Sequence, residues 1–177
     1  MTNKELGAKI RSELKAAGYP ARAISVRVNY CGYSTSVSVT IKDINISLSD
    51  VEKIVNKYKD IDYDERSGEI LMGGNTYVSV RYDYDLLDAE REKYMAEAQE
   101  IIDNNKQPHV GVEIAKDEKS GNRLLYFFES PGSIDNAVII YQHIPGLRSY
   151  YHDRYIAHNA YHLAEALAHF KARGSFI

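Results

Sequence analysis

The stretch "ISVRVNYCGYSTSVSVTI" (residues 24–41) decides the fold. Apolar and polar residues alternate in each half of it, which is typical of strands that bury one face. The turn residues "NYCGYS" lie between the two halves. The stretch therefore predicts an antiparallel hairpin whose outer face is flat and polar. The predicted inward positions are Ile24, Val26, Val28, Val37, Val39 and Ile41.

A helix is predicted on each side of this hairpin. Thr2 and Glu5 form a capping-box pattern before apolar residues at helical spacing, and Gly18 ends the helix. Ser49 and Glu52 repeat the pattern at the start of a short second helix. The residues expected to face inward from these helices are Leu6, Ile10, Leu14, Val51, Ile54, Val55 and Tyr58.

The stretch "GEILMGGNTYVSVRY" (residues 68–82) is predicted to complete the sheet. A phosphate-binding loop is excluded because a strand-like alternation, not a helix, follows Gly73-Gly74-Asn75. We interpret the three residues as a hairpin turn between two strands. Residues 3–82 then have the order α-β-β-α-β-β. The fold class is α+β, with a helix-backed antiparallel sheet.

The second half predicts another α+β unit. A helix is expected over residues 86–104, and a hairpin over residues 110–130 that turns at 119–122. Residues 136–144 fit a strand or a buried helix, and a long helix is expected over 151–171. The predicted domains are 1–85 and 86–177, either separate or packed as one globule.

No motif for catalysis or for a cofactor is present. Cys31 is the single cysteine, and the nucleophile elbow G-x-S-x-G is missing. Asp60, Asp62 and Asp64 resemble the start of a calcium loop, but Glu65 and Leu71 stand where its glycine and bidentate glutamate belong. The prediction is a protein that is not an enzyme and has no cofactor.

The strongest candidate for a metal site is a histidine stripe in the predicted last helix. His158, His162, Glu165 and His169 have spacings that place them on one helical face. Paired histidines can bind zinc, but H-E-x-x-H is missing. The stripe is expected to be exposed, and it remains a weak candidate beside the expectation of no metal.

Charge is distributed unevenly along the chain. Residues 1–59 have ten Lys and Arg against five acids, and residues 60–103 have four against thirteen. The acidic segment also contains tyrosines, which suits a surface that binds a basic groove of another protein. The predicted partner-binding residues are Asp62, Asp64, Glu65, Tyr82, Asp83, Tyr84, Asp85, Asp88 and Glu92.

Direct nucleic-acid binding is the alternative. Basic residues of the first unit beside a flat Ser/Thr face would suit a phosphate backbone, although the pI of about 6.1 lies below that of dedicated DNA-binding domains. The candidate residues are Lys4, Arg11, Lys15, Arg22 and Arg27.

The chain has no apolar run long enough to span a bilayer, and its N-terminus lacks a secretory signal core. Residence in the cytoplasm, without a membrane partner, is therefore expected. A homodimer is open, because Tyr150, Tyr151 and Tyr155 offer contact area.

Three stretches carry a family resemblance: "ISVRVNYCGYSTSVSVTIKD", "VEKIVNKY" and "SGEILMGGNTYVSVRYD". They resemble the large polyvalent protein-associated domains of phages and conjugative elements. The resemblance covers about residues 3–83, and residues 68–82 are its most specific part.

Such domains belong to proteins thought to enter the host with mobile DNA and to protect it from host defences. The resemblance brings no catalytic residues. It implies a counter-defence protein of a mobile element, acting in a bacterial host cell. The expected function is inhibition of a defence nuclease such as a type II CRISPR effector, and the alternative is a DNA-binding accessory module.

Overall fold

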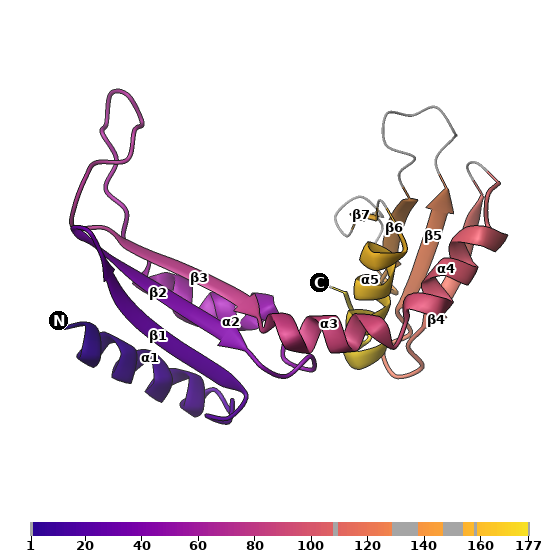
Figure 1. Ribbon diagram of the computed structural model, residues 1–177, viewed down its shortest axis with the longest axis horizontal. Helices are drawn as coiled ribbons and strands as arrows, with labels where there is room; N and C mark the ends of the chain where they lie inside the picture. Colours follow the sequence, from indigo (N-terminus) through magenta and orange to yellow (C-terminus); the bar gives the residue numbers. More distant parts are fainter. Residues whose placement is uncertain (1, 108–109, 129–137, 147–153, 158, 177) are drawn as a thin grey trace. The chain divides into compact units, whose positions relative to one another are not determined.

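The computed structural model describes residues 2–107, 110–128, 138–146, 154–157 and 159–176. The chain divides into two compact units, Met1–Asp83 and Tyr84–Ile177. Each unit has its own sheet with helices packed on it (Figure 1). The combination of helices with two sheets confirms the α+β class.

Two helices cover the sheet of the first unit. Helix α1 (Asn3–Ala16) begins at the predicted capping box, in which Thr2 and Glu5 bind each other's backbone. Helix α2 (Leu48–Val55) continues into a short 3₁₀ turn, η1 (Asn56–Tyr58). Its cap is Ser47, not Ser49 as predicted, because the Ser47 side chain accepts the hydrogen bond from the Asp50 amide.

The first sheet has three strands in the order β1 (Ile24–Cys31), β2 (Ser34–Ile41) and β3 (Thr76–Tyr82). β1 and β2 form the predicted antiparallel hairpin, but β3 pairs parallel to β2. The prediction of a wholly antiparallel sheet was therefore wrong. The reason is that α2 serves as the crossover between β2 and β3, which parallel neighbours require.

The register of the strands places the core on one face. Val26 pairs with Val39, which pairs with Val80, and the neighbouring rows are apolar as well. The helices pack on this face, so Val37, Val39 and Ile41 are fully buried. The other face has short polar side chains and Arg27 from β1 and β2, as predicted, and β3 adds Tyr77 and Arg81 to it.

The second unit contains a four-stranded antiparallel sheet. Its strands follow chain order: β4 (Gly111–Lys116), β5 (Arg123–Phe128), β6 (Val138–His143) and β7 (Arg154–Ala157). The β4–β5 hairpin turns where the sequence predicts. β6 resolves the strand-or-helix alternative in favour of the strand.

Within the described residues, three helices accompany this sheet. The predicted helix 86–104 is two helices, α3 (Tyr84–Glu92) and α4 (Met95–Asn104). The terminal helix α5 (Ala160–Arg173) starts nine residues later than predicted, because residues 154–157 belong to β7. No helix in the described parts of the chain is long and apolar enough to cross a bilayer.

Helix α5 is buried on more than one side. It packs on β4 and β7, and also against α3 and α4. Leu163, Leu167 and Phe170 join the main core of the unit with Leu124 and Tyr126. Because neighbours cover the helix on several sides, its histidines do not form the exposed stripe that the sequence predicts.

Candidate functional site

The segment between α2 and β3 is the most prominent surface feature of the first unit. Residues 60–76, which we call the finger, extend from the end of the sheet (Figure 1). Its two arms meet at isolated bridges that join Asp60 to Thr76 and Tyr63 to Ile70. The Leu71 amide also donates to the Asp62 carbonyl at 2.9 Å. The finger is thus an irregular hairpin, held by few backbone bonds.

Gly73 and Gly74 lie at the base of the finger. Both have positive φ, 93° and 75°, which glycine adopts without strain. The Gly74 amide donates to the Tyr33 carbonyl in the β1–β2 turn. These glycines direct the chain from the finger into β3. The predicted hairpin turn between two sheet strands was wrong, since residues 70–71 pair only within the finger.

Asn75 holds the finger in place. Its side chain is 2 % exposed, and its Oδ1 accepts a hydrogen bond from the Asp62 amide at 2.8 Å. Its Nδ2 donates to the Leu71 carbonyl at 2.7 Å. The Asn75 carbonyl accepts from the Thr35 amide of β2. The Asn75 side chain therefore joins the two arms of the finger, and its backbone carbonyl connects them to the sheet.

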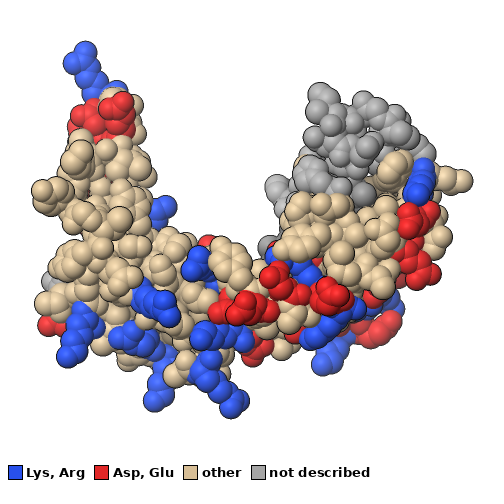
Figure 2. Space-filling model, viewed as in Figure 1, with Lys and Arg blue, Asp and Glu red and all other residues tan. Residues whose placement is uncertain are grey.

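The far end of the finger is a charged turn. Asp64 Oδ1 accepts hydrogen bonds from the amides of Ser67 and Arg66. These amides, Ser67 first, lower the pKa of the Asp64 carboxyl. Asp62 and Glu65 are exposed nearby. Figure 2 shows Asp and Glu side chains gathered at this end of the finger.

The flank and base of the finger are apolar and exposed. Met72 is 92 % exposed, Tyr33 in the β1–β2 turn is 84 % exposed, and Tyr30 near the end of β1 is 75 % exposed. Tyr33 and Gly73 are neighbours, since a Cβ on Gly73 would lie 3.5 Å from Tyr33 Cβ. Large exposed apolar groups beside charges are typical of protein-binding surfaces. We define the apolar flank as Tyr30, Tyr33, Tyr63, Ile70, Leu71 and Met72.

Sequence reasoning selected the acids of the finger but missed its apolar flank. Ile70 and Leu71 are predicted to lie in a strand or hairpin, although the three consecutive apolar residues Ile70 to Met72 do not alternate. That lack of alternation, together with the two adjacent glycines after it, was the signal that the sequence offered. The prediction that Tyr82 is a partner-binding surface residue was wrong. This tyrosine is buried, and its hydroxyl donates to the Ile46 carbonyl at 2.7 Å, so it is no surface contact residue.

The other predicted acidic residues lie elsewhere. Asp83 ends the first unit, and its amide donates to the Ile41 carbonyl. Tyr84, Asp85, Asp88 and Glu92 are exposed on α3 in the second unit. The predicted acidic site is therefore divided between the finger and α3.

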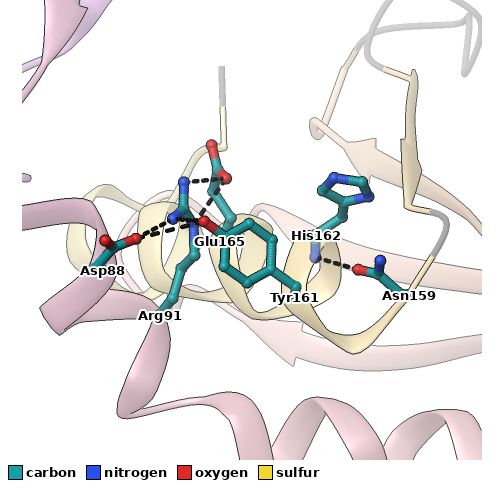
Figure 3. A network of polar contacts seen from close by, with 6 residues as sticks. All are labelled: Asp88, Arg91, Asn159, Tyr161, His162 and Glu165. Atoms are coloured by element: carbon teal, nitrogen blue, oxygen red, sulfur yellow. Dashed lines mark hydrogen bonds and ion pairs between the residues drawn. The ribbon is translucent and has the colours of Figure 1, made fainter. Parts of the chain in front are cut away.

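Asp88 takes part in a network around Arg91 (Figure 3). The Arg91 guanidinium contacts Asp88 at 2.6 Å and Glu165 of α5 at 2.9 Å, and it donates to the Tyr161 hydroxyl. Arg91 is buried, at 8 % exposure. The network joins α3 to α5, so we assign it a structural role.

The histidine stripe is divided among different environments. His158 lies outside the described residues, and Glu165 pairs with Arg91. His162 packs edge-on against Tyr161, and its amide donates to the Asn159 cap (Figure 3). His169 is buried; burial first, then Arg173 and Arg91, lower its pKa to about 4. Among the described residues no group of three acids, histidines or cysteines is arranged to hold a metal ion.

The predicted basic residues lie on two surfaces of the first unit. Lys4, Arg11 and Lys15 are exposed on α1, and Arg22 is exposed just before β1. Arg27 alternates with the buried Val26 and so lies on the open face of the sheet. Figure 2 shows Lys and Arg gathered on the side of this unit where Figure 1 places α1 and β1.

Comparison with known families identifies the part of the chain that carries the finger. The sequence model of large polyvalent protein associated domain 29 matches residues 1–98. The chain belongs to this family. The match confirms the predicted resemblance and extends it through α3. It indicates a protein associated with phages or other mobile elements. No curated protein and no solved structure matches the chain.

Proposed function

We propose that this protein is a non-enzymatic counter-defence protein that binds and inhibits a bacterial defence nuclease. Its type is that of an anti-CRISPR, and a type II CRISPR effector in the host cytoplasm is the first target to test. Membership of a phage and mobile-element family supports the setting. The finger supports binding as the mode of action.

The observation that carries the proposal is the apolar flank beside an acidic turn. Exposed Tyr and Met side chains are enriched in protein–protein interfaces, and Tyr is among the residues that contribute most of the binding energy. Asp62, Asp64 and Glu65 would lie against the basic residues that hold nucleic acid in a nuclease. A protein that occupies such a groove inhibits by competition and needs no catalytic group. Exposed Tyr84, Asp85, Asp88 and Glu92 on α3 offer a second acidic surface for the same partner.

Co-purification with a type II effector, with and without guide RNA, tests the proposal together with a DNA-cleavage assay. We expect a stable complex and loss of cleavage. Competition for the nucleic-acid groove also predicts that bound guide RNA or target DNA weakens the complex. Absence of both binding and inhibition would refute the effector as the target.

The alternative function is a DNA-binding accessory module. It is favoured by the open sheet face, where Arg27 and Arg81 lie among serines and threonines, and by the basic α1. A salt series of duplex and single-strand binding discriminates, because phosphate contacts make log K fall with log salt. Under this alternative, Arg11→Glu/Arg27→Glu abolishes binding. Under the inhibitor proposal the same variant retains nuclease inhibition.

A homodimer is compatible with either function. Tyr150 and Tyr151 lie outside the described residues. Tyr155 is half-buried and packs near Phe176 and His162, and burial raises the pKa of its hydroxyl. Light scattering of the purified chain measures the oligomeric state directly.

A further inference from the structure

A groove lies between helix α1 and strand β1 of the first unit. Its volume is about 390 Å³, in the range of sites that hold part of a ligand or peptide. Ala8, Arg11, Ser12 and Lys15 line it from the helix, at spacings that place them on one face. Ile24 and Val26 line it from the strand.

The helix and the strand come close together at one end of this groove. A Cβ on Gly7 would lie 3.3 Å from Val28 Cγ2, tighter than ordinary contact. Further along α1, the small Ala8 and Ser12 leave space above β1. The groove therefore lies over the first half of β1, next to the turn at Tyr19 and Pro20.

The strand that borders the groove is at the edge of its sheet. Among the described residues β1 pairs with β2 alone. The Ala23 carbonyl accepts a hydrogen bond from the Lys42 amide of the chain that continues β2. In an antiparallel pair, every second residue bonds to the partner strand. The N–H and C=O groups of Ile24, Val26 and Val28 therefore point away from β2. Arg11 Nη1 donates to the Val26 carbonyl at 3.0 Å, which confirms that this carbonyl faces the groove.

The charges of the groove define its partner. Its lining includes Arg11 and Lys15 and no acidic residue, while Leu14, Ile24 and Val26 form an apolar floor. Outward backbone groups beside apolar and cationic side chains suit an extended segment with apolar and acidic residues. A helix laid in the groove would leave the backbone groups of β1 unused.

We propose that an extended, acidic segment of another protein binds in this groove by adding a strand to β1. An amide of the segment takes the Val26 carbonyl, and Arg11 is released to pair with a carboxylate of the segment. Lys15 holds a second carboxylate. The site is distinct from the finger and does not depend on the function proposed for it.

Selection from a random-peptide phage library on the immobilised full chain tests the proposal. We expect enriched peptides in which Asp or Glu accompany β-branched residues. In fluorescence polarisation, the Arg11→Glu/Lys15→Glu variant should bind the enriched peptide with an affinity at least about tenfold lower, since the change reverses both charges that face the carboxylates. Lys4→Glu/Lys42→Glu is the matched control, with an equal charge change at exposed sites outside the groove. Its affinity for the peptide should stay within about twofold of that of the wild type.

Two further measurements report the mode of binding. N-methylation of alternate amides in the selected peptide should abolish binding, because strand addition needs those hydrogen bonds. When the peptide binds the full chain, the largest changes in amide NMR chemical shift should occur at residues 24–28. Equal loss in both charge variants, no acidic enrichment, or tolerance of N-methylation would each overturn the proposal. Two other results would also overturn it. One is that duplex DNA, and not the peptide, shifts the NMR signals of α1 and β1. The other is that light scattering shows a dimer and that a second copy of the chain occupies the groove.

Discussion

Asn75 is the residue on which the shape of the finger depends. Its side-chain oxygen and nitrogen bind opposite arms of the finger from a buried position. Asn75→Ala leaves the Asp62 amide and the Leu71 carbonyl without this partner, at a cost of about 1–3 kcal/mol. We expect faster amide exchange across residues 60–74. The Asn29→Ala variant, on the open sheet face, should leave exchange in the finger unchanged, and equal effects of both changes would contradict the role of Asn75.

His169 makes the second unit sensitive to acid. Its folded-state pKa is about 4, below the ordinary 6.5, so between these values the unfolded chain binds a proton that the folded chain does not. The free energy of unfolding therefore falls as the pH decreases through this window, by roughly 2 kcal/mol between pH 8 and pH 5. Urea unfolding at several pH values measures it.

The His169→Gln variant should lose most of this slope. His162→Gln, on the same helix, should keep it because His169 remains. A slope unchanged by His169→Gln would contradict the assignment.

At the residue scale, sequence reasoning succeeded where local chemistry decides. The capping box of Thr2 and Glu5 needs no distant partner, and it forms as predicted. The burial of Tyr82 and of His169 depends on elements far away in the chain. Their spacing in the sequence could not reveal which neighbours cover them.

Helices α3 and α5 are joined by the guanidinium of Arg91. Removal of the charge by Arg91→Ala leaves Glu165 partly buried and uncompensated, which costs about 3 kcal/mol. Lys106→Ala is the control, since its exposed pair with Asp103 should contribute below about 1 kcal/mol. Urea unfolding measures both. If the two variants lose the same stability, the structural role of the network is wrong.

At the scale of elements, periodicity predicted the β1–β2 and β4–β5 hairpins, whose pairing follows from short turns. It did not predict the parallel pairing of β3. A strand's alternation is the same in either direction, and the choice depends on the path of α2 and the finger between β2 and β3. The candidate site was missed in part for a related reason, because exposed apolar residues are not distinguishable from core residues by type.

The chain as a whole consists of two units, each with its own sheet and core. We predict that a fragment of residues 1–83 folds without the second unit, since its strands and helices pack mainly on one another. Circular dichroism should show cooperative thermal unfolding of the fragment. A fragment that unfolds without cooperativity, while residues 1–98 unfold cooperatively, would place α3 within the first folding unit.

The central claim is that the finger binds and inhibits a defence nuclease. The most direct test is a cleavage assay with a type II CRISPR effector and the full chain carrying Leu71→Ser/Met72→Ser. Both residues are exposed, so the change should alter stability by less than about 0.5 kcal/mol. Val110→Ser, also exposed and outside the finger, is the control. We predict that the wild type and the control inhibit cleavage and that the finger variant does not. Full inhibition by the finger variant would contradict the claim.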